Sequence, residues 1–237
     1  MGTAALIVAG GTLLSRVLGL LRQVVFAWLL GAGAAGDEYF VAFVIPDFLN
    51  HLLAGAYMAI TLIPILTRRF ADGNEEDAWR AFWAVARVLV IGSVILLAAA
   101  MPFVSPVLRV VEPGFSADQI AEATRLTRIV LPAQMFFILG QLFTAVQFAR
   151  ERFVIATLGP IIYNLGIILG GIAGALGQAE PSAEGFAWGV LAGSFLGAPE
   201  AKTVRMLVER INASGGLLGR KVELIIKDSA GSPEKAV

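Results

Sequence analysis

Four ionisable side chains lie inside segments of the chain that are otherwise almost entirely apolar. Arg16 and Arg22 fall in the first such segment, and Asp47 and His51 fall in the second. An arginine stays protonated and costs at least about 2.5–3.5 kcal/mol to insert at the bilayer centre, so it normally faces a partner or a wet cavity. Because the planar guanidinium matches phosphate oxygens, the arginines predict a cavity for an anionic substrate such as a lipid head group. The alternative is an internal Arg–Asp pair that only holds two helices together.

The segments that must position these side chains are long enough to cross a membrane. About 20 apolar residues span the hydrocarbon core as a helix. Five segments reach that length: Thr3–Leu30, Tyr39–Leu66, Ala81–Val104, Leu126–Phe148 and Phe153–Leu176. A sixth, Gly185–Gly197, would cover only about 20 Å of the roughly 30 Å core. The pattern predicts an all-α integral membrane protein with five full transmembrane helices and a truncated sixth.

The composition excludes several classes of protein. Hydrophobic residues make up 57% of the chain and charged residues only 15%, against about a quarter charged in soluble domains. The formal net charge is zero, which gives no basic field for nucleic acid. Without cysteine, and with one histidine, the chain is expected to hold no metal centre and no cofactor. No nucleophile–base set or phosphate-binding loop is apparent, so we do not expect an enzyme.

The distribution of basic residues predicts the orientation in the membrane. The connections after the second and fourth segments hold arginines, whereas those after the first and fifth hold no Lys or Arg. The arginines are Arg68, Arg69, Arg80, Arg150 and Arg152. Basic residues favour cytoplasmic loops, so the N-terminus is expected on the cytoplasmic side. The first segment is too long for a removable signal peptide and lacks a basic leader and cleavage site.

Small residues and prolines predict how the helices pack. Small residues at four-residue spacing allow close approach of helix backbones in lipid, and prolines inside or near spans are expected to kink them. The two stripes are Gly11, Ser15 and Gly19, and Gly166, Gly170 and Gly174. The prolines are Pro46, Pro64, Pro132 and Pro160.

The composition changes sharply after Gly197. Val204, Leu207, Val208 and Ile211 recur at the spacing of an amphipathic helix, and Val222–Lys227 is typical of a short strand. We therefore expect two parts: a transmembrane part over residues 1–197 and a soluble helix–strand fragment over residues 198–237. About 40 residues are too few to bury a core alone.

Several blocks of residues occur in a characteristic order along the first part. The blocks are Ser15-Arg16-Val17-Leu18-Gly19 with Arg22; Gly31-Ala32-Gly33, Asp37, Phe40-Val41-Ala42-Phe43 and Pro46; Ile63-Pro64-Ile65-Leu66; Pro113-Gly114-Phe115; and Pro160 with Asn164. In this order they resemble the MurJ/MviN family of lipid II flippases. The resemblance implies the N-terminal lobe of a MATE/MOP-type exporter fold, which has fourteen transmembrane helices in two lobes.

The resemblance also implies a function in the bacterial inner membrane, in the synthesis of the peptidoglycan cell wall. Such a protein moves an undecaprenyl-pyrophosphate-linked precursor between leaflets by alternating access, with membrane lipids around it. Arg16 and Arg22 are then expected to contact the pyrophosphate, and Asp37 to act at the outer gate. Asn50 and His51 stand where the family has two arginines, and are expected at the same substrate site.

The sequence departs from the family at three places and in length. Asn50-His51 replaces the arginine pair, Gly55-Ala56 replaces a Glu-Gly step, and Gln23 stands where an Asp is common. The cavity is therefore expected to be less basic than in the family. Because only the first lobe is present, we expect transport to be incomplete unless a missing second lobe or a homo-oligomer supplies the other half.

The last part of the chain resembles a different family. Residues 209–216 and 218–224, with Asp228 and residues 231–237, are similar to the opening of a leucine/isoleucine/valine-type periplasmic binding protein. This resemblance implies, as an alternative function, the solute-binding component of an amino-acid ABC transporter. A non-functional fusion of two fragments is the third possibility.

Overall fold

The computed structural model describes residues 2–31, 33–54, 62–150, 153–176 and 182–197. The chain divides by its contacts into the units Met1–Ala198 and Pro199–Val237, and every described residue belongs to the first. The predicted helix and strand after Gly197, and the resemblance to a binding protein, lie outside the described residues. The fold below is that of the first unit alone.

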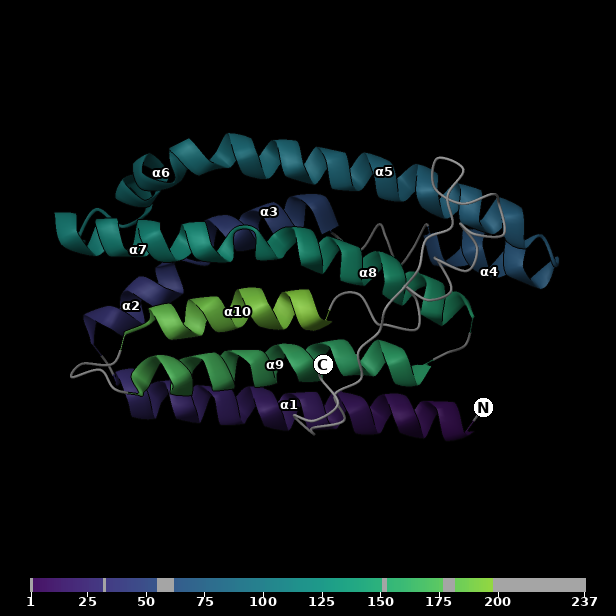
Figure 1. Ribbon diagram of the computed structural model, residues 1–237, viewed down its shortest axis with the longest axis horizontal. Coiled ribbons are helices and arrows are strands. Elements are labelled where there is room, and N and C mark those ends of the chain that lie inside the picture. Colours follow the sequence, from purple (N-terminus) through teal and green to yellow (C-terminus); the bar gives the residue numbers. More distant parts are fainter. Residues whose placement is uncertain (1, 32, 55–61, 151–152, 177–181, 198–237) are drawn as a thin grey trace, which may run out of the picture. The chain divides into compact units, whose positions relative to one another are not determined.

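The described residues form helices joined by short connections (Figure 1). The helices are α1 (Gly2–Leu30), α2 (Ala34–Val41), α3 (Val44–Ala54), α4 (Ile63–Ala71), α5 (Glu75–Ala100), the short 3₁₀ helix η2 (Met101–Phe103), α6 (Val104–Val111), α7 (Ala117–Val130), α8 (Ala133–Ala149), α9 (Phe153–Ala175) and α10 (Glu184–Gly197). The predicted all-α class is confirmed for this part of the chain.

Four helical segments of the described residues are long and apolar enough to cross a membrane. They are Val8–Leu30, Glu75–Val111, Ala117–Ala149 and Thr157–Ala175. These segments overlap the first, third, fourth and fifth predicted spans. The short sixth helix predicted at Gly185–Gly197 is α10, whose 14 residues cover about 21 Å. The protein is therefore a multi-pass membrane protein.

The second predicted span, Tyr39–Leu66, is wrong as a single helix. A turn at residues 42–43 interrupts the helix, between α2 and α3. Pro46 explains the break, because it has no amide hydrogen for the carbonyl of Ala42 and its ring collides with that carbonyl. The predicted kink at Pro46 is thus confirmed, and the 11-residue α3 covers only about 16 Å. Residues 55–61, within the predicted span, lie outside the described residues.

The other prolines behave differently from one another. Pro132 stands at the junction of α7 and α8, within the helical segment Ala117–Ala149. Pro64 stands in the first turn of α4, where an amide hydrogen would have no helical carbonyl to bind, so the proline costs the helix no hydrogen bond. Pro160 lies inside α9, which continues through it, and its carbonyl accepts a hydrogen bond from Asn164 Nδ2 at 2.9 Å.

Two helices begin before the apolar stretches that predicted them, because polar caps extend them. The Asn74 side chain accepts a hydrogen bond from the Asp77 amide at the start of α5. Ser116 and Gln119 form a reciprocal capping box at the start of α7. The length of the apolar stretch alone therefore underestimates the length of both helices.

The glycine stripe of α9 packs directly on α10, which confirms the predicted close approach of helix backbones. An added Cβ at Gly170 would lie 2.5 Å from the Gly185 carbonyl oxygen, and one at Gly166 would lie 2.6 Å from the Gly193 Cα. Side chains of any size would separate the helices. α10 supplies its own glycine stripe at four-residue spacing, which was not among the predicted stripes: Gly185, Gly189, Gly193 and Gly197.

The stripe of α1 faces the other side of α9, so α9 lies between α1 and α10 (Figure 1). An added Cβ at Gly11 would lie 2.5 Å from the Thr157 Cβ, and Asn164 Nδ2 lies 3.4 Å from the Ser15 carbonyl oxygen. The opposite face of α1 is apolar and exposed, with Leu20 at 69% and Trp28 at 79%. Lipid is the solvent that suits such a surface.

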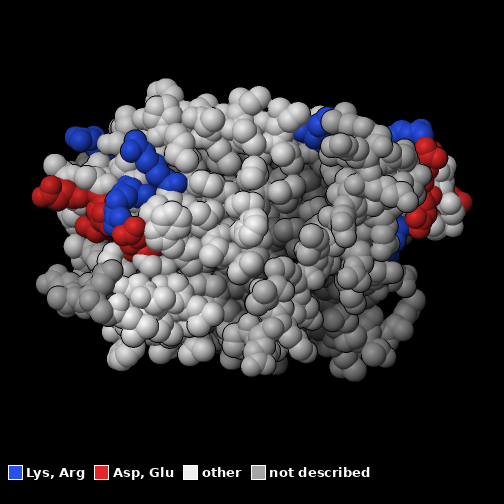
Figure 2. Space-filling view, viewed as in Figure 1, with Lys and Arg blue, Asp and Glu red and all other residues white. Residues whose placement is uncertain are grey.

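Most charged side chains, and all the acidic ones, lie toward the two ends of the bundle on the face shown in Figure 2, with a wide uncharged area between them. Arg125 of α7 joins α10 through Glu184, at 2.6 Å. Arg150, beyond α8, joins α5 through Glu75, at 3.0 Å. Ion pairs at the ends and an apolar middle are the arrangement that a bilayer requires.

Candidate functional site

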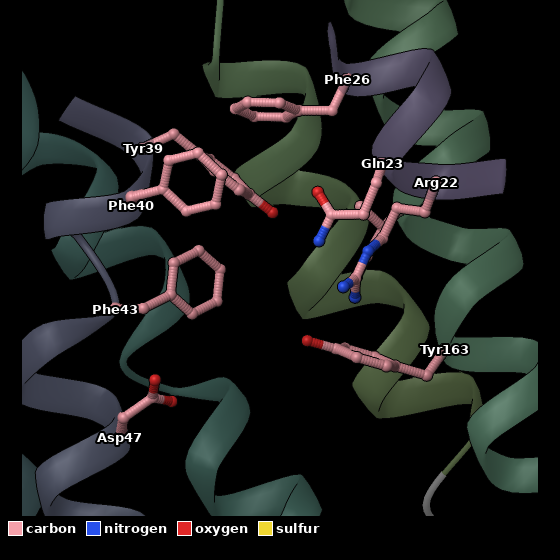
Figure 3. Close-up of a pocket in the computed structure, with 9 residues that line it drawn as sticks. Arg22, Gln23, Phe26, Tyr39, Phe40, Phe43, Asp47 and Tyr163 are labelled. Carbon is pink, nitrogen blue, oxygen red and sulfur yellow. The ribbon is translucent and has the colours of Figure 1, made fainter. Parts of the chain in front are cut away.

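A cavity of about 260 Å³ opens between α1, α2, α3 and α9 (Figure 3). We call it the Arg22 cavity. Its lining residues are Arg22, Gln23 and Phe26 of α1, Tyr39 and Phe40 of α2, Phe43 of the following turn, Asp47 of α3, and Tyr163 and Ile167 of α9. The cavity thus combines one cation, one carboxylate, an amide, two phenols and apolar rings.

The small-residue stripe of α1 explains why Arg22 reaches this cavity. Arg22 follows Ser15 by seven residues, or two helical turns, so it shares the face that packs on α9. It lies eight residues, about 12 Å, before the end of α1 at Leu30, which places it well inside the apolar span. Its side chain is half-buried, and its guanidinium points into the cavity beside the Tyr163 ring in Figure 3.

Among the described residues, no ion pair joins Arg22 to an acidic side chain. Asp47 lines the same cavity but lies across it from Arg22 (Figure 3). The predicted alternative, an Arg–Asp pair that holds two helices together, is therefore not formed in the described part of the chain. The guanidinium keeps its donors available for an anionic ligand.

The break between α2 and α3 brings two further groups to the cavity. Phe43 lies in the turn that Pro46 causes, and Asp47 follows one turn later, with its amide donating to the Phe43 carbonyl at 2.8 Å. Both side chains are directed into the Arg22 cavity (Figure 3). The proline that disrupts the span thus also shapes the site.

Four aromatic rings form one continuous side of the cavity, which we call the aromatic wall: Phe26, Tyr39, Phe40 and Phe43. Phe26 contacts Tyr39 at 5.0 Å between ring centroids and Phe40 at 5.1 Å, and Tyr39 contacts Phe43 at 4.9 Å. Phe186 of α10 supports the wall from behind, 5.2 Å from Phe26. Each such pair stabilises by about 0.5–1.5 kcal/mol beyond its burial, so the wall is a rigid surface.

Arg16 does not line the Arg22 cavity. It follows Ser15 by one residue, so it projects about 100° away from the face of α1 that meets α9. Its side chain is exposed, although Arg22 on the same helix is half-buried. Arg16 and Arg22, which are both predicted to contact the substrate, therefore lie in different environments, and only Arg22 lines the cavity.

The other three predicted site residues also lie outside the cavity lining. Asp37 is exposed in the first turn of α2, where its charge suits the helix N-terminus. Asn50 is half-buried on α3, and the exposed His51 has its Nδ1 2.8 Å from the Asp47 carbonyl oxygen. Of the five predicted residues, Arg22 alone is brought to the cavity.

Most of the lining is not predicted from the sequence. In the sequence Asp47 stands out only as a charge inside an apolar segment, and Phe40 and Phe43 only as parts of a family block. Tyrosine was the unused signal, because two of the three tyrosines in the chain, Tyr39 and Tyr163, meet here. A phenol inside a lipid-embedded bundle needs a polar neighbour or a wet cavity, as an arginine does.

No group of three or more His, Cys, Asp or Glu side chains lies close enough to hold a metal ion within the described ranges. The polar atoms of the Arg22 cavity are instead suited to hydrogen bonding. A guanidinium, an amide and two phenols can donate to phosphate or carbohydrate oxygens, and the Asp47 carboxylate can accept from hydroxyl groups.

Known proteins similar to this chain are lipid II flippases. The family model of the lipid II flippase MurJ matches residues 26–198. The lipid II flippase MurJ of Burkholderia cenocepacia is 32% identical over 196 residues, which is 81% of this chain and 38% of the relative. The probable lipid II flippase MurJ of Vibrio cholerae is 31% identical over 179 residues, 70% of this chain and 33% of the relative.

A solved structure of the lipid II flippase MurJ in an inward closed conformation shares the fold. Its TM-score is 0.62 at 20% identity, over 87% of this chain and 45% of that one. The chain spans less than two fifths of the length of the curated relatives named here. These likenesses favour the flippase over the solute-binding alternative. The chain belongs to the lipid II flippase MurJ family.

Proposed function

We propose that this chain forms the N-terminal lobe of a flippase for a lipid-linked oligosaccharide, the lipid II of its relatives. The observation that supports this most is Arg22, a cation without an acidic partner among the described residues, facing a cavity inside an apolar bundle of this family. Such a cation is costly in a membrane unless an anion or water meets it. The undecaprenyl pyrophosphate group is the anion that we assign to it.

In this proposal Arg22 binds the pyrophosphate through its planar fork. Arg16 and Asp37, which lie outside the cavity, would meet the substrate or a gate when the second lobe closes against the first. Asn50 and His51, one turn after Asp47, would lie along the same path. Alternating access needs two lobes that rock against each other, so the second lobe must come from further sequence or from another copy of the chain.

The finer architecture belongs to the same proposal. We infer a MATE/MOP-type lobe over residues 1–197, with α10 as its truncated sixth helix, in the bacterial inner membrane with the N-terminus in the cytoplasm. The basic residues at the end of α4 (Arg68 and Arg69), near the start of α5 (Arg80) and directly after α8 (Arg150 and Arg152) support this orientation. Residues 198–237 would be a separate fragment of binding-protein type.

The test is lipid II translocation in bacterial cells depleted of their own flippase. We expect little rescue by the chain alone, and rescue when it is joined to the remaining lobe of the Burkholderia relative. Arg22→Gln in that fusion should abolish rescue, whereas Arg109→Gln, which removes an exposed arginine of α6, should not. Equal rescue by both variants would exclude Arg22 as the substrate-binding residue.

A further inference from the structure

The Arg22 cavity presents more than the binding of a phosphate group requires. A pyrophosphate needs cationic and N–H donors, yet most of the lining here is aromatic, and Asp47 would repel a phosphate that came close to it. We propose that the aromatic wall and Asp47 form a subsite for the pyranose ring that is attached to the pyrophosphate. This inference rests on the proposed function and assigns to the cavity a second part of the same substrate.

The aromatic wall offers a surface on which a sugar ring can stack. Phe40 is 55% exposed and Phe43 is partly exposed, while Tyr39, at 7% exposure, anchors them from within. The axial C–H groups of a pyranose are slightly positive and pack against the negative face of an aromatic ring. Because the rings contact one another and Phe186, they lose little further freedom when a ligand arrives.

The polar groups around the wall are matched to hydroxyl and acetamido groups. Figure 3 shows the Gln23 amide, the Asp47 carboxylate and the Tyr163 hydroxyl directed into the cavity from separate helices. Within the described residues, these three side chains have no hydrogen-bonding partner in the protein. A carboxylate accepts from two sugar hydroxyls, and an amide both donates and accepts.

The prenyl tail of the substrate is the other apolar group that could occupy this surface. A tail would cover the Asp47 carboxylate and the phenols without replacing their hydrogen bonds to water, which is unfavourable for each buried group left unsatisfied. A sugar ring satisfies those groups and still uses the aromatic faces. The volume of about 260 Å³ lies just below the roughly 300–1,000 Å³ of pockets for whole drug-sized ligands, which fits a single ring.

The experiment compares two probes on the purified 237-residue chain in lipid nanodiscs, by native mass spectrometry. One probe is farnesyl pyrophosphate, and the other is farnesyl pyrophosphate that carries one N-acetylhexosamine. The variants are Phe43→Ala, Asp47→Asn and Arg22→Gln. The matched control is Phe48→Ala, an exposed phenylalanine of α3 outside the cavity lining. The melting temperature of each variant reports whether it folds.

We expect the wild type to bind the glycosylated probe more tightly than farnesyl pyrophosphate. Phe43→Ala and Asp47→Asn should each weaken binding of the glycosylated probe by about three- to tenfold and leave farnesyl pyrophosphate unchanged. Arg22→Gln should weaken binding of both probes, and Phe48→Ala should weaken binding of neither probe.

Two results overturn the sugar subsite alone. They are equal affinity of the wild type for both probes, and equal weakening of both probes by Phe43→Ala, which would assign the wall to the prenyl tail. Failure of the folded wild type to bind either probe would overturn the proposed function together with the subsite. Failure of the sugar subsite can therefore be distinguished from failure of the proposed function.

Discussion

The packing of α9 on α10 predicts a large effect from the smallest possible substitution, Gly170→Ala. The added Cβ would lie 2.5 Å from the Gly185 carbonyl oxygen and 2.6 Å from the Gly189 Cα. Ordinary contact begins at 3.4 Å, so the two helices would have to separate by roughly 1 Å. Overpacking of this kind costs about 1–3 kcal/mol.

Gly92→Ala is the matched control, because Gly92 lies inside α5 and an added Cβ there has nothing within 4 Å. Both variants gain the same helix propensity, so their difference isolates the clash. At about 2–4 °C per kcal/mol for a chain of this size, Gly170→Ala should melt about 2–12 °C below Gly92→Ala in detergent. Equal melting temperatures would refute the close backbone contact between α9 and α10.

Two further changes test how the site is shaped and how the bundle is joined. Pro46→Ala restores a donor for the Ala42 carbonyl, so α2 and α3 should straighten, the aromatic wall should move, and binding of the glycosylated probe should fall. Pro64→Ala, at a helix start, should leave binding unchanged, and equal losses would contradict the role given to the break. The hydrogen bond from Arg125 lowers the pKa of Glu184 from its ordinary value of 4.5. The ion pair therefore stabilises the fold fully above pH 4.5, and this stabilisation is lost as the pH falls through the lowered pKa. Glu184→Gln should therefore melt slightly below the wild type at pH 7 and together with it at low pH, and a difference independent of pH would contradict the ion pair.

Much of the bundle could be predicted from the sequence because a bilayer permits few alternatives. Apolar runs of about 20 residues must be helices in lipid, and glycines at four-residue spacing must meet another backbone. Both rules applied to α1 and to the stripe at Gly166, Gly170 and Gly174. The rules failed where a proline competed with an apolar run, as at Pro46, because hydropathy does not register a missing amide hydrogen.

The site was less predictable, because membership in a cavity depends on which helix faces meet. Arg16 and Arg22 are the same residue type in the same apolar segment. Only Arg22 lies on the same face of α1 as Ser15, which is the face that packs on α9. That distinction follows from helical geometry once the packing face is known. That Phe43 and Tyr163 line the same cavity does not follow from helical geometry, because the two residues lie in distant segments and Phe43 stands at the break between α2 and α3.

The central claim is that Arg22 holds the anionic group of the substrate, and equilibrium binding of farnesyl pyrophosphate tests it most directly. Losing a charge-assisted hydrogen-bonding partner costs about 1.5–3 kcal/mol, which is roughly a 10- to 150-fold weaker affinity. We predict that weakening for Arg22→Gln, a smaller one for Arg22→Lys, and none for Arg109→Gln. Unchanged affinity in a folded Arg22→Gln variant would contradict the account.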